Sequence, residues 1–232
     1  MKIEERERAC LELLQKFPEG YVLIGGYAVS AFEFPRFSVD LDVVVSEKDF
    51  ERFSGILENE GFSREKEADE FALTYEGRFV CFQKMVEFLP VSVDLLVGMV
   101  QSRQTGAAYS FDYVRKNSEI REVTGFGVKA SAEARVADRE MLMALKLNSM
   151  RMVDQRDIIS LCAGDVDTGK VASHLTRVPG EKIKEHLESL LSFLEDPKSR
   201  DTLKGVFVFS DSALDGLLNR ARATLGEIAT KL

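Results

Sequence analysis

The sequence predicts an α+β protein in which a mixed β-sheet flanked by helices is followed by a C-terminal helical region. Two observations predict this fold class. Up to about residue 130, short runs of β-branched and aromatic residues alternate with helical patterns. From about Ala137 onward, the regular patterns have the spacing of amphipathic helices. We therefore expect an α/β domain over residues 1–130 and a helical domain over residues 131–232.

The first 60 residues predict alternating helices and strands. Pro18 and Gly20 end the first helix, and Gly25-Gly26 ends the first strand, because these residues interrupt regular structure. The strand Tyr21 to Ile24 is continuously apolar, which is typical of a strand buried on both faces. In order, we expect a helix over residues 3–17, a strand over 21–24, a helix over 27–33, a strand over 39–45 and a helix over 46–59.

Three further strands are expected from runs rich in β-branched and aromatic residues, at 71–75, 79–85 and 91–97. The turn Glu76-Gly77 favours a hairpin between the first two. A short helix is expected over 105–114, and one or two strands over 120–128. The helical domain is expected to contain helices at 137–150, 155–162, 170–177, 181–194 and 213–231. The apolar run at 206–209 fits either a strand or a buried turn.

Composition excludes several classes of protein. The 31 Lys and Arg against 39 Asp and Glu give a net charge of −8, the opposite of a bulk nucleic-acid binder, although a local basic patch stays open. The three cysteines are far apart and form no CxxC, which disfavours a disulfide framework or a zinc cluster and favours free thiols in a reducing cytosol. No signal peptide and no apolar run of about 20 residues is present, so we expect a cytoplasmic protein without membrane contact.

Two acids, Asp40 and Asp42, lie inside the apolar run over residues 39–45. Side chains of a strand alternate between its faces, so both carboxylates point the same way, about 7 Å apart, and Leu41 and Val43 point to the opposite face. Neighbouring buried carboxylates repel each other. A Mg²⁺ ion would remove this conflict because it prefers carboxylate oxygen, and two such ions can hold the attacking and leaving oxygens in phosphoryl transfer.

A third acid, Asp94, lies in the apolar run over residues 93–97. On a strand next to that of Asp40 and Asp42, it would complete a three-carboxylate metal site. The alternative is that these acids lie at strand ends, solvated and inert. The pair Gly25-Gly26 lies between a strand and a helix, 14 residues before the first of them. Lacking side chains, it lets backbone N–H groups approach a triphosphate, although such a pair also serves as a plain tight turn.

These residues resemble a known signature. The segments that carry the resemblance are Gly25-Gly26-Tyr27-Ala28 and Arg36-Phe37-Ser38-Val39-Asp40-Leu41-Asp42. They are similar to the Gly-Gly turn and Arg-x-Ser-x-Asp-x-Asp strand of the DNA polymerase β-like nucleotidyltransferase superfamily, and Asp94 stands where that family places its third carboxylate. Lys146, Arg151, Asp154 and Asp157 resemble the AbiEii-like branch, which comprises toxins of bacterial abortive-infection and toxin–antitoxin pairs. The resemblance covers about residues 20–165.

The resemblance implies a nucleotidyltransferase fold and transfer of a nucleoside monophosphate from an NTP, with Mg²⁺ or Mn²⁺ as the metal. Three acids would hold the metal: Asp40, Asp42 and Asp94. Asp94 would also activate the acceptor hydroxyl as a base, and Lys146 would contact the nucleotide or its phosphates. Five further residues would cradle phosphates or support the strand beside them: Gly25, Gly26, Ser30, Arg36 and Ser38.

The sequence departs from the family in two places. Tyr27 replaces the usual small polar residue after the glycines, and the stretch from Lys146 to Arg151 is shorter than in many relatives. Arg151, Asp154 and Asp157 also have a simpler explanation, as ion pairs along one helix at a spacing of three residues.

Two hypotheses of function follow. In the first, the protein is an enzyme whose acceptor is RNA (such as a tRNA end), a protein hydroxyl or a small molecule. In the second, the same fold binds a nucleotide or a partner protein without catalysis. The toxin–antitoxin resemblance makes an antitoxin a natural partner under either hypothesis.

Overall fold

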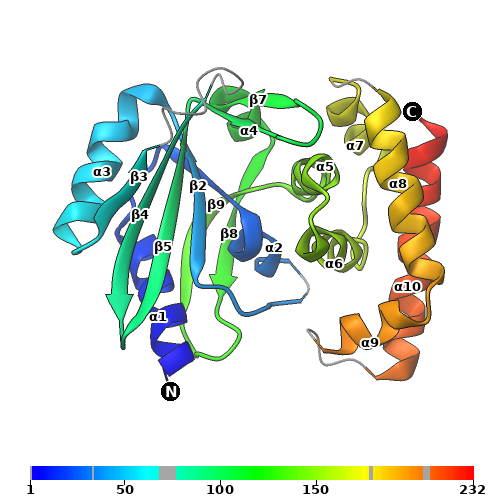
Figure 1. Ribbon diagram of the computed structural model, residues 1–232, viewed down its shortest axis with the longest axis horizontal. Helices are drawn as coiled ribbons and strands as arrows, with labels where there is room; N and C mark the ends of the chain where they lie inside the picture. The colour runs from blue at the N-terminus through cyan, green and yellow to red at the C-terminus, as the bar shows by residue number, and fades with distance from the viewer. Residues whose placement is uncertain (1, 33, 68–76, 178–179, 206–209) are drawn as a thin grey trace. The chain divides into compact units, whose positions relative to one another are not determined.

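The computed structural model describes residues 2–232 except 33, 68–76, 178–179 and 206–209. The chain divides into two compact units (Figure 1). The first, which we call the sheet unit, comprises Met1–Ala31, Pro35–Gln101 and Ala108–Asp138. The second, the helical unit, comprises Phe32–Phe34, Ser102–Ala107 and Arg139–Leu232.

A seven-stranded mixed sheet, in the order β3-β4-β5-β2-β1-β9-β8, forms the centre of the sheet unit. The pairs β2–β5 and β1–β9 are parallel, and the other neighbouring pairs are antiparallel. The strands are β1 (Tyr21–Ile24), β2 (Asp40–Val45), β3 (Ser63–Glu67), β4 (Arg78–Val86), β5 (Leu89–Val97), β8 (Ser118–Thr124) and β9 (Ser131–Ala137). This sheet and its helices confirm the expected α+β class.

One face of the sheet is covered by two helices, α1 (Lys2–Lys16) and α3 (Phe50–Asn59). The ring of Tyr21 on β1 makes edge contacts with Phe17, just after α1, and with Phe53 on α3. Tyr21 pairs with Val45 across the sheet, and paired residues share a face. Because side chains alternate along β2, Leu41, Val43 and Val45 point to this covered face, and Asp40 and Asp42 point to the opposite face.

The remaining elements of the sheet unit differ in part from the expectations. The expected helix at 27–33 begins earlier, because α2 spans Gly25–Ser30 and includes both glycines. Residues 105–114, expected as a helix, contain a strand followed by the start of a helix, and the strand at 71–75 lies outside the described residues. These elements are α2, the 3₁₀ helix η1 (Glu47–Asp49), α4 (Phe111–Lys116) and a separate two-stranded sheet of β6 (Met99–Gln101) and β7 (Ala108–Ser110).

The helical unit contains α5 (Arg139–Ser149), α6 (Met152–Leu161), α7 (Thr168–Leu175), α8 (Gly180–Glu195), α9 (Lys198–Lys204) and α10 (Asp211–Thr230). Each of the five expected helices is present, shifted by a few residues, and α9 is additional. The run at 206–209 lies outside the described residues. Apolar side chains that recur at helical spacing on α10, such as Leu214, Leu218 and Leu225, are buried in this unit. Among the described helices, none has the length and apolar character to cross a membrane.

Candidate functional site

Asp42 and Asp94 lie side by side on the face of the sheet opposite α1 and α3. They are register partners on the parallel strands β2 and β5, and neighbouring strands are about 4.8 Å apart. The two acids belong to a row of register partners that runs across the sheet. On β1, Ile24 pairs with Asp42, and on β4, Cys81 pairs with Asp94. The sheet topology thus brings together two of the three acids from positions 52 residues apart in the sequence.

Asp40 lies two residues before Asp42 and shares its face, at the exposed start of β2. It pairs in register with Ser92, whose hydroxyl donates a hydrogen bond to Asp40 Oδ1 at 3.3 Å. Within the residues that the structure describes, no group of three or more His, Cys, Asp or Glu side chains converges closely enough to hold a metal ion as it stands. The three carboxylates would therefore have to approach one another more closely to share one cation.

The electrostatics of the row favour a cation. Burial raises the pKa of Asp94, a hydrogen bond from the Cys81 thiol lowers it in part, and the negative charge of Asp40 raises it further. The net direction is upward, chiefly because burial penalises the charged form of this carboxyl, and a bound cation would offset that penalty. Carboxylate oxygens are the ligands that Mg²⁺ and Mn²⁺ prefer. In its chemistry, this donor set fits a hard divalent cation.

Gly25 is in close contact with the Asp42 side chain. Its φ is +73°, a left-handed conformation that favours glycine, and a Cβ at this position would lie 1.8 Å from Asp42 Oδ2. Only a residue without a side chain leaves room for the carboxylate here. The glycine predicted from sequence therefore has two reasons to be present, its backbone conformation and the space that Asp42 occupies.

Gly26 is in similar contact with the two polar residues before β2. A Cβ on Gly26 would lie 2.8 Å from Arg36 Nη2 and 3.0 Å from Ser38 Oγ. The guanidinium and the hydroxyl thus lie against the first turn of α2, where Ile24 provides no side-chain cap for the backbone N–H groups. The backbone of Arg36 is held in turn by Ser30. The buried hydroxyl of Ser30 accepts a hydrogen bond from the Arg36 backbone N–H at 3.2 Å and donates one to the Arg36 backbone carbonyl at 3.3 Å.

Tyr27, the departure from the family pattern, is buried in the core of the sheet unit. Its hydroxyl donates to the carbonyl of Ser38 at 2.8 Å, and burial raises its pKa. The ring therefore connects α2 to the segment that leads into β2. A large residue is accommodated after the two glycines because its side chain turns inward.

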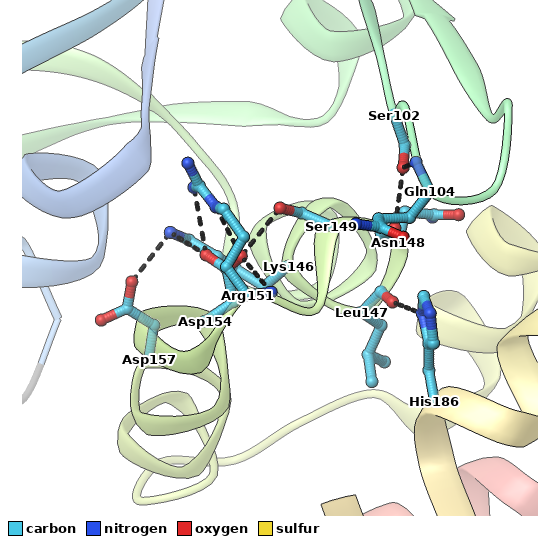
Figure 2. A network of polar contacts seen from close by, with 10 residues as sticks. All are labelled: Ser102, Gln104, Lys146, Leu147, Asn148, Ser149, Arg151, Asp154, Asp157 and His186. Atoms are coloured by element: carbon cyan, nitrogen blue, oxygen red, sulfur yellow. Dashed lines mark hydrogen bonds and ion pairs between the residues drawn. The ribbon is translucent and has the colours of Figure 1, made fainter. Parts of the chain in front are cut away.

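Lys146 belongs to the helical unit, on α5, and is 4% exposed. Its ammonium lies 2.9 Å from Asp154 Oδ1 and 2.8 Å from Asp157 Oδ2, and both acids belong to α6 (Figure 2). Both carboxylates are fully buried. The three residues form a buried ion network between two consecutive helices.

Asp154 is the centre of this network. Its Oδ2 accepts from the Arg151 backbone N–H and Nε, each at 2.9 Å, and from the Ser149 hydroxyl at 2.7 Å (Figure 2). Burial raises the pKa of Asp154, but the charges and hydrogen bonds of Lys146 and Arg151 outweigh it and lower the pKa to about 2. The simpler explanation from sequence describes only Arg151 and Asp154, because Asp157 pairs with the preceding helix.

Cys81 and Ser92 are neighbours of the acids that the sequence analysis did not single out. Cys81 hydrogen-bonds Asp94, and Ser92 hydrogen-bonds Asp40. Alternation along β4 puts Cys81 on one face with Phe79 and Gln83, but only the β4–β5 pairing shows that this face carries Asp94. The sequence contains the alternation but not the pairing.

No protein-family model and no curated protein matches this sequence, whereas solved structures match its fold. One is protein JHP933 from Helicobacter pylori, with 17% sequence identity, a TM-score of 0.52, and coverage of 99% of this chain and 91% of the other. Another, from H. pylori, is named a "putative nucleotidyltransferase"; the identity is 17%, the TM-score 0.51, and the coverage 99% and 94%. The chain has a nucleotidyltransferase-like fold. In this nucleotidyltransferase-like fold, the paired acids and the glycine turn occupy one face of the central sheet.

Proposed function

We propose that this protein is a metal-dependent nucleotidyltransferase that transfers a nucleoside monophosphate from an NTP to an acceptor hydroxyl. The observation that carries the proposal is the placement of Asp42, which lies in register with Asp94 on one side and against Gly25 on the other. The two acids proposed to bind the metal and the turn proposed to bind phosphate are thereby adjacent. The likeness in fold to a protein named a "putative nucleotidyltransferase" supports the same activity.

Asp42 and Asp94 would hold the metal, and Asp40 would join them from the start of β2. Bound Mg²⁺ or Mn²⁺ would neutralise charge on the phosphates and polarise the α-phosphate. The raised pKa of Asp94 supports this assignment, because groups with perturbed pKa values cluster at functional sites. A raised pKa also favours proton uptake by Asp94, so we assign it the deprotonation of the acceptor hydroxyl.

The triphosphate would bind at the first turn of α2. The backbone N–H groups of Gly25 and Gly26 would donate to the phosphates, and the guanidinium of Arg36 would add a positive charge beside Gly26. Ser38 would contribute a hydroxyl, and Ser30 would hold the Arg36 backbone in place. Catalysis would then consist of positioning the phosphates and neutralising their charge.

The role of Lys146 in nucleotide binding is assigned from the family resemblance. Within the helical unit, its charge is compensated by Asp154 and Asp157. The resemblance also proposes an AbiEii-like toxin with a cognate antitoxin as partner. The acceptor remains one of three classes: RNA, a protein hydroxyl or a small molecule.

The proposal is tested by following label from α-labelled NTPs in the presence of Mg²⁺ to RNA, to protein and to small-molecule acceptors. Wild-type protein is expected to transfer label, and Asp42→Ala is expected to abolish transfer, with a loss of at least about a thousandfold because the metal site is broken. Asp112→Ala, which removes an exposed acid from the sheet unit, serves as the matched control. Transfer that survives Asp42→Ala would exclude the metal mechanism. Absence of NTP binding would favour a non-catalytic partner-binding module.

A further inference from the structure

Strand β8 is an edge of the seven-stranded sheet, since β9 is its neighbour on one side and the order of strands ends there. Edge strands carry a row of backbone N–H and C=O groups that can pair with another chain. The sequence of β8 is Ser-Glu-Ile-Arg-Glu-Val-Thr. Glu119, Ile120 and Glu122 on it are exposed, and Ile120 is 50% exposed although it is a large apolar residue.

The hydrogen bonds at the two ends of β8 show which of its backbone groups point outward. The Asp138 N–H donates to the Asn117 carbonyl, and the Gly125 N–H donates to the Ala130 carbonyl. Both bonds follow the β8–β9 register, and hydrogen-bonded pairs alternate in an antiparallel ladder. The odd-numbered residues from 117 to 125 therefore bond to β9, and four even-numbered residues direct their backbone groups away from the sheet: Ser118, Ile120, Glu122 and Thr124.

These outward backbone groups are available for pairing. Among the residues that the structure describes, none donates to them or accepts from them. A second β8 strand in antiparallel orientation can bond to them only if even-numbered residues meet even-numbered residues. Two copies of β8 related by a two-fold axis can satisfy this condition in a small number of registers.

The charges of β8 distinguish between these registers. With the axis at Ile120, Glu119 of each copy lies opposite the partner's Arg121, which places opposite charges together twice, and Ile120 lies opposite the partner's Ile120. Moving the axis to residue 121 places Arg121 opposite the partner's Arg121. Moving it to residue 119 places Glu119 opposite the partner's Glu119. Like charges directly opposite each other destabilise a strand pair, so of these three registers the one with the axis at Ile120 is favoured.

We propose that β8 is a homodimerisation edge, on which a second copy of this chain pairs antiparallel with the two-fold axis at Ile120. The pairing would form about six backbone hydrogen bonds and join the two sheets into one. Arg121 already contacts Glu119 of its own strand at 2.9 Å and donates to the carbonyl of Ala31, so its guanidinium is held on the face where the partner's Glu119 arrives. Charged side chains usually discourage pairing at an edge. On β8, the charged side chains of Glu119 and Arg121 instead disfavour the registers with the axis at residue 119 or 121.

The test is the molar mass in solution, measured by sedimentation velocity over a concentration series. Wild-type protein is expected to reach twice the chain mass of 26.0 kDa. Glu119→Arg and Arg121→Glu each bring like charges together twice, so each should raise the dimer dissociation constant by at least about tenfold. Mixing the two variants restores both opposite-charge pairs, so the mixture should dimerise like the wild type.

The control is Glu12→Arg at an exposed position of α1. It changes the net charge by the same amount as Glu119→Arg and should leave the dimer intact. Far-UV circular dichroism checks that Arg121→Glu, which loses the contact with Ala31, remains folded. Wild-type protein that stays monomeric overturns the proposal. A dimer that tolerates Glu119→Arg, or folded variants that fail to associate when mixed, overturns it as well. Because Asp42 and Asp94 take no part in the pairing, this outcome is independent of nucleotidyl transfer.

Discussion

The smallest unit of the site is the contact between Gly25 and Asp42. The left-handed backbone of Gly25 and the space beside it are both needed to seat the carboxylate in register with Asp94. A single methyl group tests this, since it would occupy the position of Asp42 Oδ2. The sequence predicted both residues as part of the site but gave no sign that they touch.

We predict that Gly25→Ala destabilises the protein by about 1–3 kcal/mol and abolishes nucleotidyl transfer, because alanine is strained at this φ and displaces the carboxylate. Chemical denaturation and the label-transfer assay measure the two effects. Gly55→Ala is the matched control, since no atom lies within 4 Å of its added Cβ and it sits inside α3. That change should stabilise the fold by about 0.5–1 kcal/mol and leave transfer intact. Full activity of Gly25→Ala would show that the contact is not required.

Secondary-structure elements were predictable where the apolar pattern was strong. The apolar run of β1, the largely apolar strand β2 and the amphipathic helices α1, α8 and α10 were expected close to their observed bounds. Strand β9 was missed because its inward residues are mostly alanine, which has little β-propensity, although Ala132, Ala134 and Val136 do alternate. Helix α9 was missed because it is short and carries four charged residues among seven.

The junction of α5 and α6 allows a prediction at the level of elements. Asp154 accepts from the N-cap residue of α6 and from Lys146 of α5, so it fixes the start of one helix to the other. Its pKa in the folded protein, about 2, is lower than that of an ordinary aspartate. Its stabilising contribution, about 2 kcal/mol, is therefore present above pH 4 and is lost as the pH falls from about 4 to about 2.

Asp154→Asn should reduce the free energy of unfolding at neutral pH by about 3 kcal/mol, because Lys146 loses one of its two buried partners. The variant should also lose less stability than the wild type between pH 4 and pH 2. Urea denaturation at several pH values measures both effects. Asp165→Asn, at an exposed position between α6 and α7, is the control. Parallel stability curves for wild type and Asp154→Asn would contradict the assigned role.

At the level of the whole molecule, the class of fold was predictable from the sequence. The sequence also proposed the three acids as site residues, but it did not predict the details of their surroundings. A resemblance to a signature identifies Asp40, Asp42 and Asp94, but it does not say which other strand supplies neighbours. Cys81 reaches Asp94 only through the pairing of β4 with β5, which the hairpin at Glu87 and Phe88 sets up. Long-range pairings of this kind are not encoded in local periodicity.

Nucleotidyl transfer by this site requires that Asp42 and Asp94 together bind the metal that accompanies an NTP. Isothermal titration calorimetry with an NTP analogue that cannot be cleaved, with Mg²⁺ and then with chelator, measures this binding directly. We predict that wild-type protein binds the analogue only with Mg²⁺. Asp42→Asn and Asp94→Asn, which keep the shape of the side chain but remove its charge, should each weaken binding at least about tenfold. Binding that is equally tight without metal, or unchanged in both variants, would contradict it.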